Sequence, residues 1–230
     1  MAFLQEPERP HQPAIRAPAV VVWLLVTLGL AHAARVYAAA NLSKEILFNF
    51  AFIPARYSPH FLTTHHIDPG SWPERIVPFF SYVFLHGDFA HLAVNCLWLL
   101  AFGPIVARRF GAGLFLLFFF LCAVAAAAVH LALNWESIDP VLGASGAIAG
   151  LMAAGIRIFY AREEGRLASI FSTQIMAFTL FWLAVNYIAG VTGLGAGAEP
   201  HLIAWQAHIG GYFAGLLLAG RFDAFRRRRT

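Results

Sequence analysis

Two polar side chains in the apolar part of this 230-residue chain could together carry out nucleophilic chemistry. Ser145 lies in the small-residue run at 143–146, where an apolar segment begins, and its hydroxyl is a candidate nucleophile. His208 lies in the last apolar segment and is a candidate general base that would deprotonate that hydroxyl. The pair predicts acyl transfer through a serine, provided that the fold brings the two segments together.

Attack on a carbonyl also needs donors for the oxyanion that forms. His91 and Asn95 are four residues apart, so they share one helix face, and His86 lies five residues before His91 and further around that helix. The alternative for each residue taken alone is a hydrogen bond that fixes helix packing, which is common for Asn or His in a membrane bundle.

The composition sets where these residues must lie. The chain is 60% hydrophobic and 12% charged, which indicates an all-α protein with several membrane-spanning helices. A soluble helical protein would have to bury several apolar runs that have almost no polar face. The expected membrane helices cover residues 18–39, 78–102, 112–133, 145–160, 170–191 and 203–219.

The fourth of these segments is the shortest. About 16 residues rise about 24 Å, less than the hydrocarbon thickness, so Ser145 should start below the membrane surface at the floor of a cavity. Small residues line one side of this segment and of the sixth, and they predict close approach of the two helices. They are Gly143, Gly146 and Gly150 with Ala147 and Ala154, and Ala207, Gly211 and Gly215.

Basic residues predict the orientation. With both termini on the cytoplasmic side, twelve Lys and Arg residues lie inside and four outside. The first segment is interpreted as a retained helix and not a signal peptide, because five spans would put the arginine-rich tail on the wrong side. That tail predicts anchoring to anionic headgroups of the lipid bilayer, so the positive charge requires no nucleic-acid partner.

The connection at 41–77 is long, and its first part, 42–52, has the mixed composition of an amphipathic helix in the interface. Tyr57, His60, His65 and His66 follow, without the regular spacing of a zinc site, so interfacial side chains are the preferred interpretation. Cys96 and Cys122 both lie in apolar runs and predict packing, with no disulfide and no metal.

Taken together and in order, these motifs resemble those of the rhomboid intramembrane serine proteases over residues 78–220. The resemblance implies a six-transmembrane-helix bundle at 18–220 with a membrane-embedded first loop, between a cytoplasmic segment at 1–17 and a basic tail at 221–230. The roles that it implies are Ser145 as nucleophile, His208 as base, an oxyanion hole of the Ser145 amide with His91 and Asn95, and a cavity at His86, Gly143 and Gly146.

Three positions depart from the family pattern. Many rhomboids have an aromatic residue four positions after the serine, where this chain has Ala149, so either another residue orients His208 or the dyad is looser. A ring restored at 149 is predicted to be tolerated and to raise turnover, because it would limit rotation of the imidazole. The alternative is that the helices are packed too tightly there, in which case overpacking would lower both stability and activity. Gly103 is followed at the family's glutamate position by Ala107, and Trp72 and Arg75 are not adjacent as the family's pair is.

The expected function is therefore an intramembrane endopeptidase without cofactor or metal, whose partners are transmembrane protein substrates, in a bacterial inner membrane. One alternative is a catalytically silent rhomboid-like protein that binds membrane helices. The other is an unrelated small transporter, against which the lack of paired broken helices counts. The sequence predicts no oligomeric state.

Overall fold

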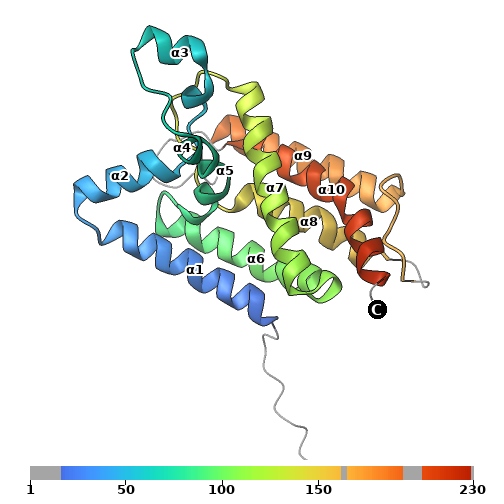
Figure 1. The fold of residues 1–230 in the computed structure, drawn as a ribbon. Helices are drawn as coiled ribbons and strands as arrows, with labels where there is room; N and C mark the ends of the chain where they lie inside the picture. Colours follow the sequence, from blue (N-terminus) through green and yellow to red (C-terminus); the bar gives the residue numbers. More distant parts are fainter. Residues whose placement is uncertain (1–16, 162–164, 194–203, 229–230) are drawn as a thin grey trace, which may run out of the picture.

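The computed structural model describes residues 17–161, 165–193 and 204–228. They form a bundle of helices from which part of a folded first loop projects (Figure 1). The helices are α1 (Ala19–Val36), α2 (Ala40–Phe50), η1 (Pro54–Tyr57), α3 (Pro59–Thr64), α4 (Trp72–Ile76), α5 (Pro78–Ser81), η2 (Tyr82–Phe84), α6 (Phe89–Phe110), α7 (Ala112–Leu133), α8 (Ser145–Phe159), α9 (Thr173–Thr192) and α10 (Trp205–Arg227).

Four of these helices, α1, α6, α7 and α9, are long and apolar enough to cross a membrane. The apolar α8 has 15 residues, and α10 has 23 residues with arginines in its last turn. The all-α membrane bundle is thus confirmed, and the predicted bounds of α7 are the observed ones. Four parts of the prediction lie outside the described residues: residues 1–16 of the segment at 1–17, the helix start at 203, Arg162, and residues 229–230.

The predicted single helix over 78–102 is wrong. The chain there forms α5 and η2 and becomes extended at Leu85, and α6 begins only at Phe89. Asp88 caps α6, because its carboxylate accepts a hydrogen bond from the His91 amide at 2.7 Å. The helix then continues through Pro104 to Phe110 and ends at Gly111, which has a φ of +82°.

The closest helix pair is α8 with α10, and glycines make their contact possible. A Cβ atom at Gly211 would overlap the carbonyl oxygen of Gly146, and one at Gly215 would overlap that of Gly150. The two backbones therefore touch at two places about one helical turn apart, as the small-residue spacing predicts.

The first loop is folded and holds the segment that leads to Ser145. Phe52 and Val141 form an isolated antiparallel bridge, with N–O distances of 3.1 and 2.8 Å. The Ala55 amide also donates to the Ser137 carbonyl at 2.9 Å. In this way the loop between α7 and α8 is fixed by backbone bonds to the loop between α1 and α6.

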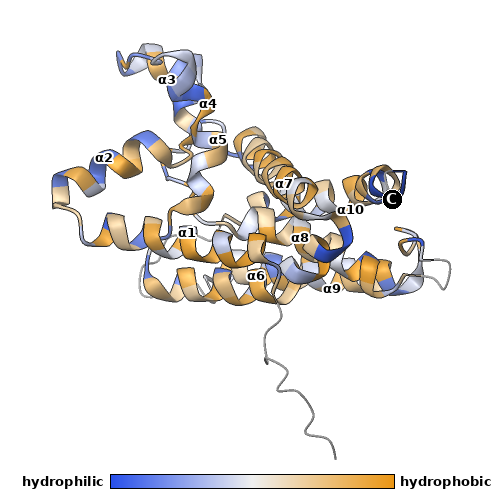
Figure 2. Ribbon diagram, turned by 60° about the horizontal axis from the view of Figure 1, so that its bottom comes forward, coloured by the Kyte–Doolittle hydropathy of each residue, from blue (hydrophilic) through white to orange (hydrophobic). Residues whose placement is uncertain are grey.

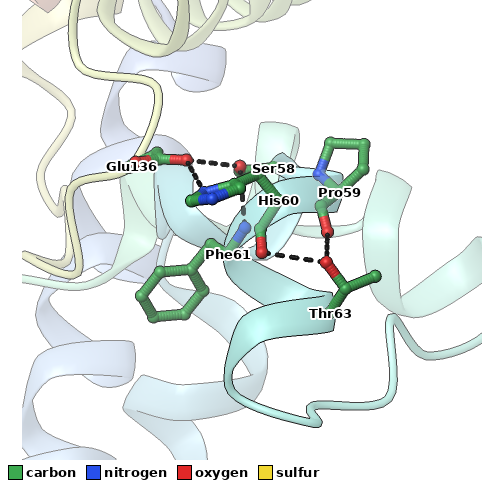
Figure 3. Close-up of polar contacts among 6 residues, drawn as sticks. All are labelled: Ser58, Pro59, His60, Phe61, Thr63 and Glu136. Atoms are coloured by element: carbon green, nitrogen blue, oxygen red, sulfur yellow. Dashed lines mark hydrogen bonds and ion pairs between the residues drawn. The ribbon is translucent and has the colours of Figure 1, made fainter.

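A side-chain contact strengthens this attachment at the projecting helix α3 (Figure 3). Ser58 caps α3 by accepting from the Phe61 amide at 3.2 Å, and its hydroxyl donates to Glu136 at 3.0 Å. His60 Nδ1 lies 3.0 Å from the same carboxylate oxygen. The hydrogen bonds from Ser58 and His60 hold the pKa of Glu136 below its usual value, so the contact is made with an ionised carboxylate at neutral pH.

The outward faces of the bundle are apolar, as lipid contact requires (Figure 2). In α9 the buried residues are Ile175, Asn186 and Gly190 alone, while Leu180 and Phe181 are each 66% exposed. Helix α9 therefore packs against the bundle along one narrow face, and this face includes the polar side chain of Asn186.

Arginines join the helices at the ends far from Ser145. Arg157 of α8 is buried and donates to the carbonyls of Ala168 and Leu216, at 2.9 and 2.6 Å. Asp223 of α10 lies between Arg109 of α6, at 2.5 Å, and Arg227, at 3.0 Å. This pairing explains why α10 continues past the predicted end at 219, since Asp223 must reach α6.

Candidate active site

Ser145 is the first residue of α8, as the sequence predicts. Gly143, two residues earlier, has a φ of +105°, a backbone conformation that favours glycine, and its amide donates to the Tyr82 carbonyl at 3.0 Å. The Tyr82 hydroxyl in turn donates to the Ala123 carbonyl of α7 at 2.8 Å. The turn before Ser145 is therefore bonded to Tyr82, and Tyr82 is in turn bonded to α7.

His208 lies on α10 with its imidazole directed at Ser145. The distance between His208 Nε2 and Ser145 Oγ is 2.8 Å, which is a normal hydrogen bond. Gly146 and Gly211, whose backbones touch, lie beside Ser145 and three residues after His208. The close approach of α8 and α10 is thus what brings the two side chains within hydrogen-bond distance.

A third side chain, absent from the sequence prediction, contacts the same imidazole. His208 Nδ1 lies 2.8 Å from Oδ1 of Asn186 on α9, and Asn186 Nδ2 donates to the Trp205 carbonyl at 3.1 Å. Of the two alternatives that Ala149 left open, this contact favours the first, in which another residue orients His208. The signal in the sequence is a single amide side chain in the middle of an apolar helix. A polar group inside a membrane costs free energy unless it bonds a partner or has a function.

The space beside Ala149 is already filled. Ala149 is buried in a cluster with Ile175 and Tyr212, and the Tyr212 ring stacks on that of Trp182 at a centroid distance of 4.3 Å. This packing favours the second of the two outcomes predicted for a ring at position 149, which is overpacking.

We expect Ala149→Phe to destabilise the protein by about 1 to 3 kcal/mol, because the ring has no room, and to lower activity with it. Thermal unfolding in detergent measures the first effect and substrate turnover the second. Ala128→Phe is the matched control, since Ala128 is an exposed alanine of α7. Improved stability and turnover in Ala149→Phe would contradict this expectation.

His91 and Asn95 lie on α6 and face the turn before Ser145. A Cβ atom at Gly143 would be 2.7 Å from His91 Nε2 and 3.7 Å from Asn95 Nδ2. Asn95 is buried, and its Nδ2 donates to the His91 carbonyl on its own helix at 3.0 Å. Both side chains therefore present nitrogen atoms to the N-terminal end of α8, where developing negative charge would also meet the helix dipole.

The remaining predicted cavity residues lie in packed surroundings. His86 is in the turn before α6, not on the helix as predicted, and is fully buried with its ring 5.2 Å from that of His91. His32 of α1, also buried, lies 6.3 Å from His86 and was not predicted to be near the site. Gly146 packs against α7, because a Cβ atom there would be 2.6 Å from that of Ala126.

The first-loop histidines do not gather. His60 pairs with Glu136, and His65 packs on Phe61 at a ring distance of 4.4 Å. Within the described ranges, no three His, Cys, Asp or Glu side chains are close enough together to hold a metal ion.

A serine hydrogen-bonded to an imidazole at the start of a short helix, inside a bundle of apolar helices, defines a protein like the intramembrane serine proteases. The Rhomboid domain family model matches residues 73–222, from α4 to α10. The chain therefore belongs to the rhomboid family and is an integral membrane protein. A comparison with curated proteins gave no significant match.

Proposed function

We propose that this protein is an intramembrane serine endopeptidase that cleaves transmembrane segments of other proteins. The observation that carries the proposal is the 2.8 Å distance between Ser145 Oγ and His208 Nε2, on two helices whose contact depends on glycines. A serine in a merely structural role would need neither an imidazole nor a fixed turn before it.

In the proposed reaction, Ser145 Oγ attacks the scissile carbonyl while His208 Nε2 accepts the hydroxyl proton. The backbone amide of Ser145 and the side chains of His91 and Asn95 donate to the oxyanion. His208 then returns the proton to the leaving amine, which leaves an acyl ester on Ser145. Water, deprotonated by the same imidazole, hydrolyses the ester and regenerates the serine.

The substrate is a membrane helix, whose peptide groups are hidden by its own hydrogen bonds. It must unwind locally before attack, so helix-weakening residues near the cut are favoured. The distribution of basic residues supports cytoplasmic termini, which places Ser145 in the outer half of the membrane and the cleavage near the outer end of the substrate. The membrane that we propose is a bacterial inner membrane.

The test is active-site labelling of the purified full-length protein with a fluorophosphonate or isocoumarin probe. Wild type is expected to be labelled, and Ser145→Ala and His208→Ala to lose labelling and cleavage of a model transmembrane substrate. Ser43→Ala, which changes a serine of α2 far along the chain from α8, should behave as wild type.

Labelling that survives Ser145→Ala would reject this nucleophile. Folded wild-type protein that neither reacts nor cleaves, yet retains a membrane helix in a binding assay, would favour the catalytically silent alternative.

A further inference from the structure

We propose that Asn186 is the positioning residue of the active site, holding His208 in the tautomer and rotamer that accept the proton of Ser145. The inference rests on the proposed function and extends it, because the site becomes a Ser-His-Asn array instead of a dyad. Asn186 itself does not touch the reacting atoms, and it acts through the imidazole.

The two bonds of the Asn186 amide determine which of its atoms faces the imidazole. A backbone carbonyl only accepts, so the group that meets the Trp205 carbonyl at 3.1 Å is the NH₂ group. The oxygen must then face His208 Nδ1, at 2.8 Å. An oxygen there requires that Nδ1 carries the proton, and in neutral imidazole this leaves the lone pair on Nε2, which faces Ser145.

Asn186 is itself held in place. It is buried at 7% exposure, and the carbonyl that it binds belongs to Trp205, the first residue of α10 and three residues before His208. One turn further along α9, a Cβ atom at Gly190 would be 2.7 Å from Trp205 Cβ. The Asn186 amide therefore bonds both the imidazole of His208 and the backbone of α10, the helix that carries His208. These two bonds restrict rotation of the imidazole more than the bond to Ser145 alone would.

This arrangement also explains the departure at position 149. An aromatic ring four residues after the serine would lie on α8 and would restrain the imidazole by stacking. Asn186 lies on α9 and restrains the imidazole by a directional hydrogen bond. The polar contact thus replaces a packing contact, and position 149 is free to be a small residue of the Tyr212 cluster.

The first readout is the protonation state of His208 in the resting protein, which needs no substrate. Nitrogen-15 NMR of histidine-labelled full-length protein in detergent, assigned with His208→Gln, is expected to show the proton on Nδ1. In Asn186→Leu the signals of His208 should shift to a mixture of the two tautomers. A resonance that is identical in both proteins would overturn the proposal.

The second readout is kinetic. Asn186→Ala is expected to lower kcat roughly tenfold to hundredfold, with KM changed less than about threefold, because substrate contacts remain. Asn186→Asp keeps the acceptor at His208 but loses the donor to the Trp205 carbonyl, and its charge favours imidazolium. It should therefore retain more turnover than Asn186→Ala and lose activity at higher pH than wild type as the solution is acidified. A purely structural role predicts that Asn186→Asp loses as much turnover as Asn186→Ala.

Thr179→Val is the matched control. It removes a different polar contact between α9 and α10, the 2.8 Å bond between Thr179 and the Tyr212 hydroxyl, and leaves His208 untouched. Equal kinetic losses in Thr179→Val and Asn186→Ala, with unchanged pH profiles, would assign Asn186 to packing. Wild type without turnover that depends on Ser145 would instead reject the proposed function, and NMR would still decide the Asn186 contact.

Discussion

Gly211→Ala is expected to lower turnover by about a hundredfold or more, although it adds one methyl group. The new Cβ atom would overlap the Gly146 carbonyl oxygen and lie 2.7 Å from the Gly146 carbonyl carbon. Backbone cannot rotate away, so α8 and α10 must separate by on the order of 1 Å, and a misplacement of that size costs roughly a hundredfold in rate. The 2.8 Å bond between Ser145 and His208, beside this contact, would be stretched first.

The measurement is turnover per folded molecule together with the unfolding temperature in detergent. Gly29→Ala in α1 is the matched control, because a Cβ atom there meets nothing within 4 Å. That change should leave turnover unaltered and stabilise the helix by up to about 1 kcal/mol. Normal turnover in Gly211→Ala would mean that the active geometry does not depend on touching backbones.

Asn95→Ala is expected to lower kcat by about two to three orders of magnitude with little change in stability. The Asn95 amide bonds the His91 carbonyl of its own helix, so its loss strands no partner on another helix. Its nitrogen instead faces the turn that precedes Ser145, where the oxyanion would form. The effect should therefore appear in catalysis and not in folding.

Asn134→Ala provides an unusually close control. Asn134 at the end of α7 also donates to the carbonyl of a histidine four residues earlier, His130, at the same distance of 3.0 Å. Removing it should change stability as little as Asn95→Ala does, and it should leave kcat nearly unaltered. If Asn95→Ala instead reduces the amount of folded protein and preserves activity per folded molecule, Asn95 has a packing role.

The sequence predicted those parts of the fold that depend on local composition. Residues 112–133 form one uninterrupted apolar run, and α7 has those bounds. Segment 78–102 is also mostly apolar, but the chain becomes extended at Leu85 and Asp88 caps a new helix within it. Hydropathy averaged over a span does not detect such a local change of backbone conformation.

The pair Ser145 and His208 was predicted because both residues lie in recognisable small-residue surroundings. Asn186 was missed because a lone amide in an apolar helix is usually a packing residue, and nothing near it in the sequence marks its partner. Its role depends on the rotation of α9 about its axis, which brings residue 186 to face α10. That rotation is set by tertiary contacts, chiefly Gly190 against Trp205.

The tight contact of α8 with α10 has a consequence for the barrier function of the membrane. Below the site, backbones touch at Gly150 and Gly215, and further along Arg157 and Asp223 bind α8 and α10 to their neighbours. A contact without room for side chains also excludes water. If the proposed hydrolysis takes place at Ser145, the contact between α8 and α10 therefore offers ions and protons no route across the bilayer along this pair of helices.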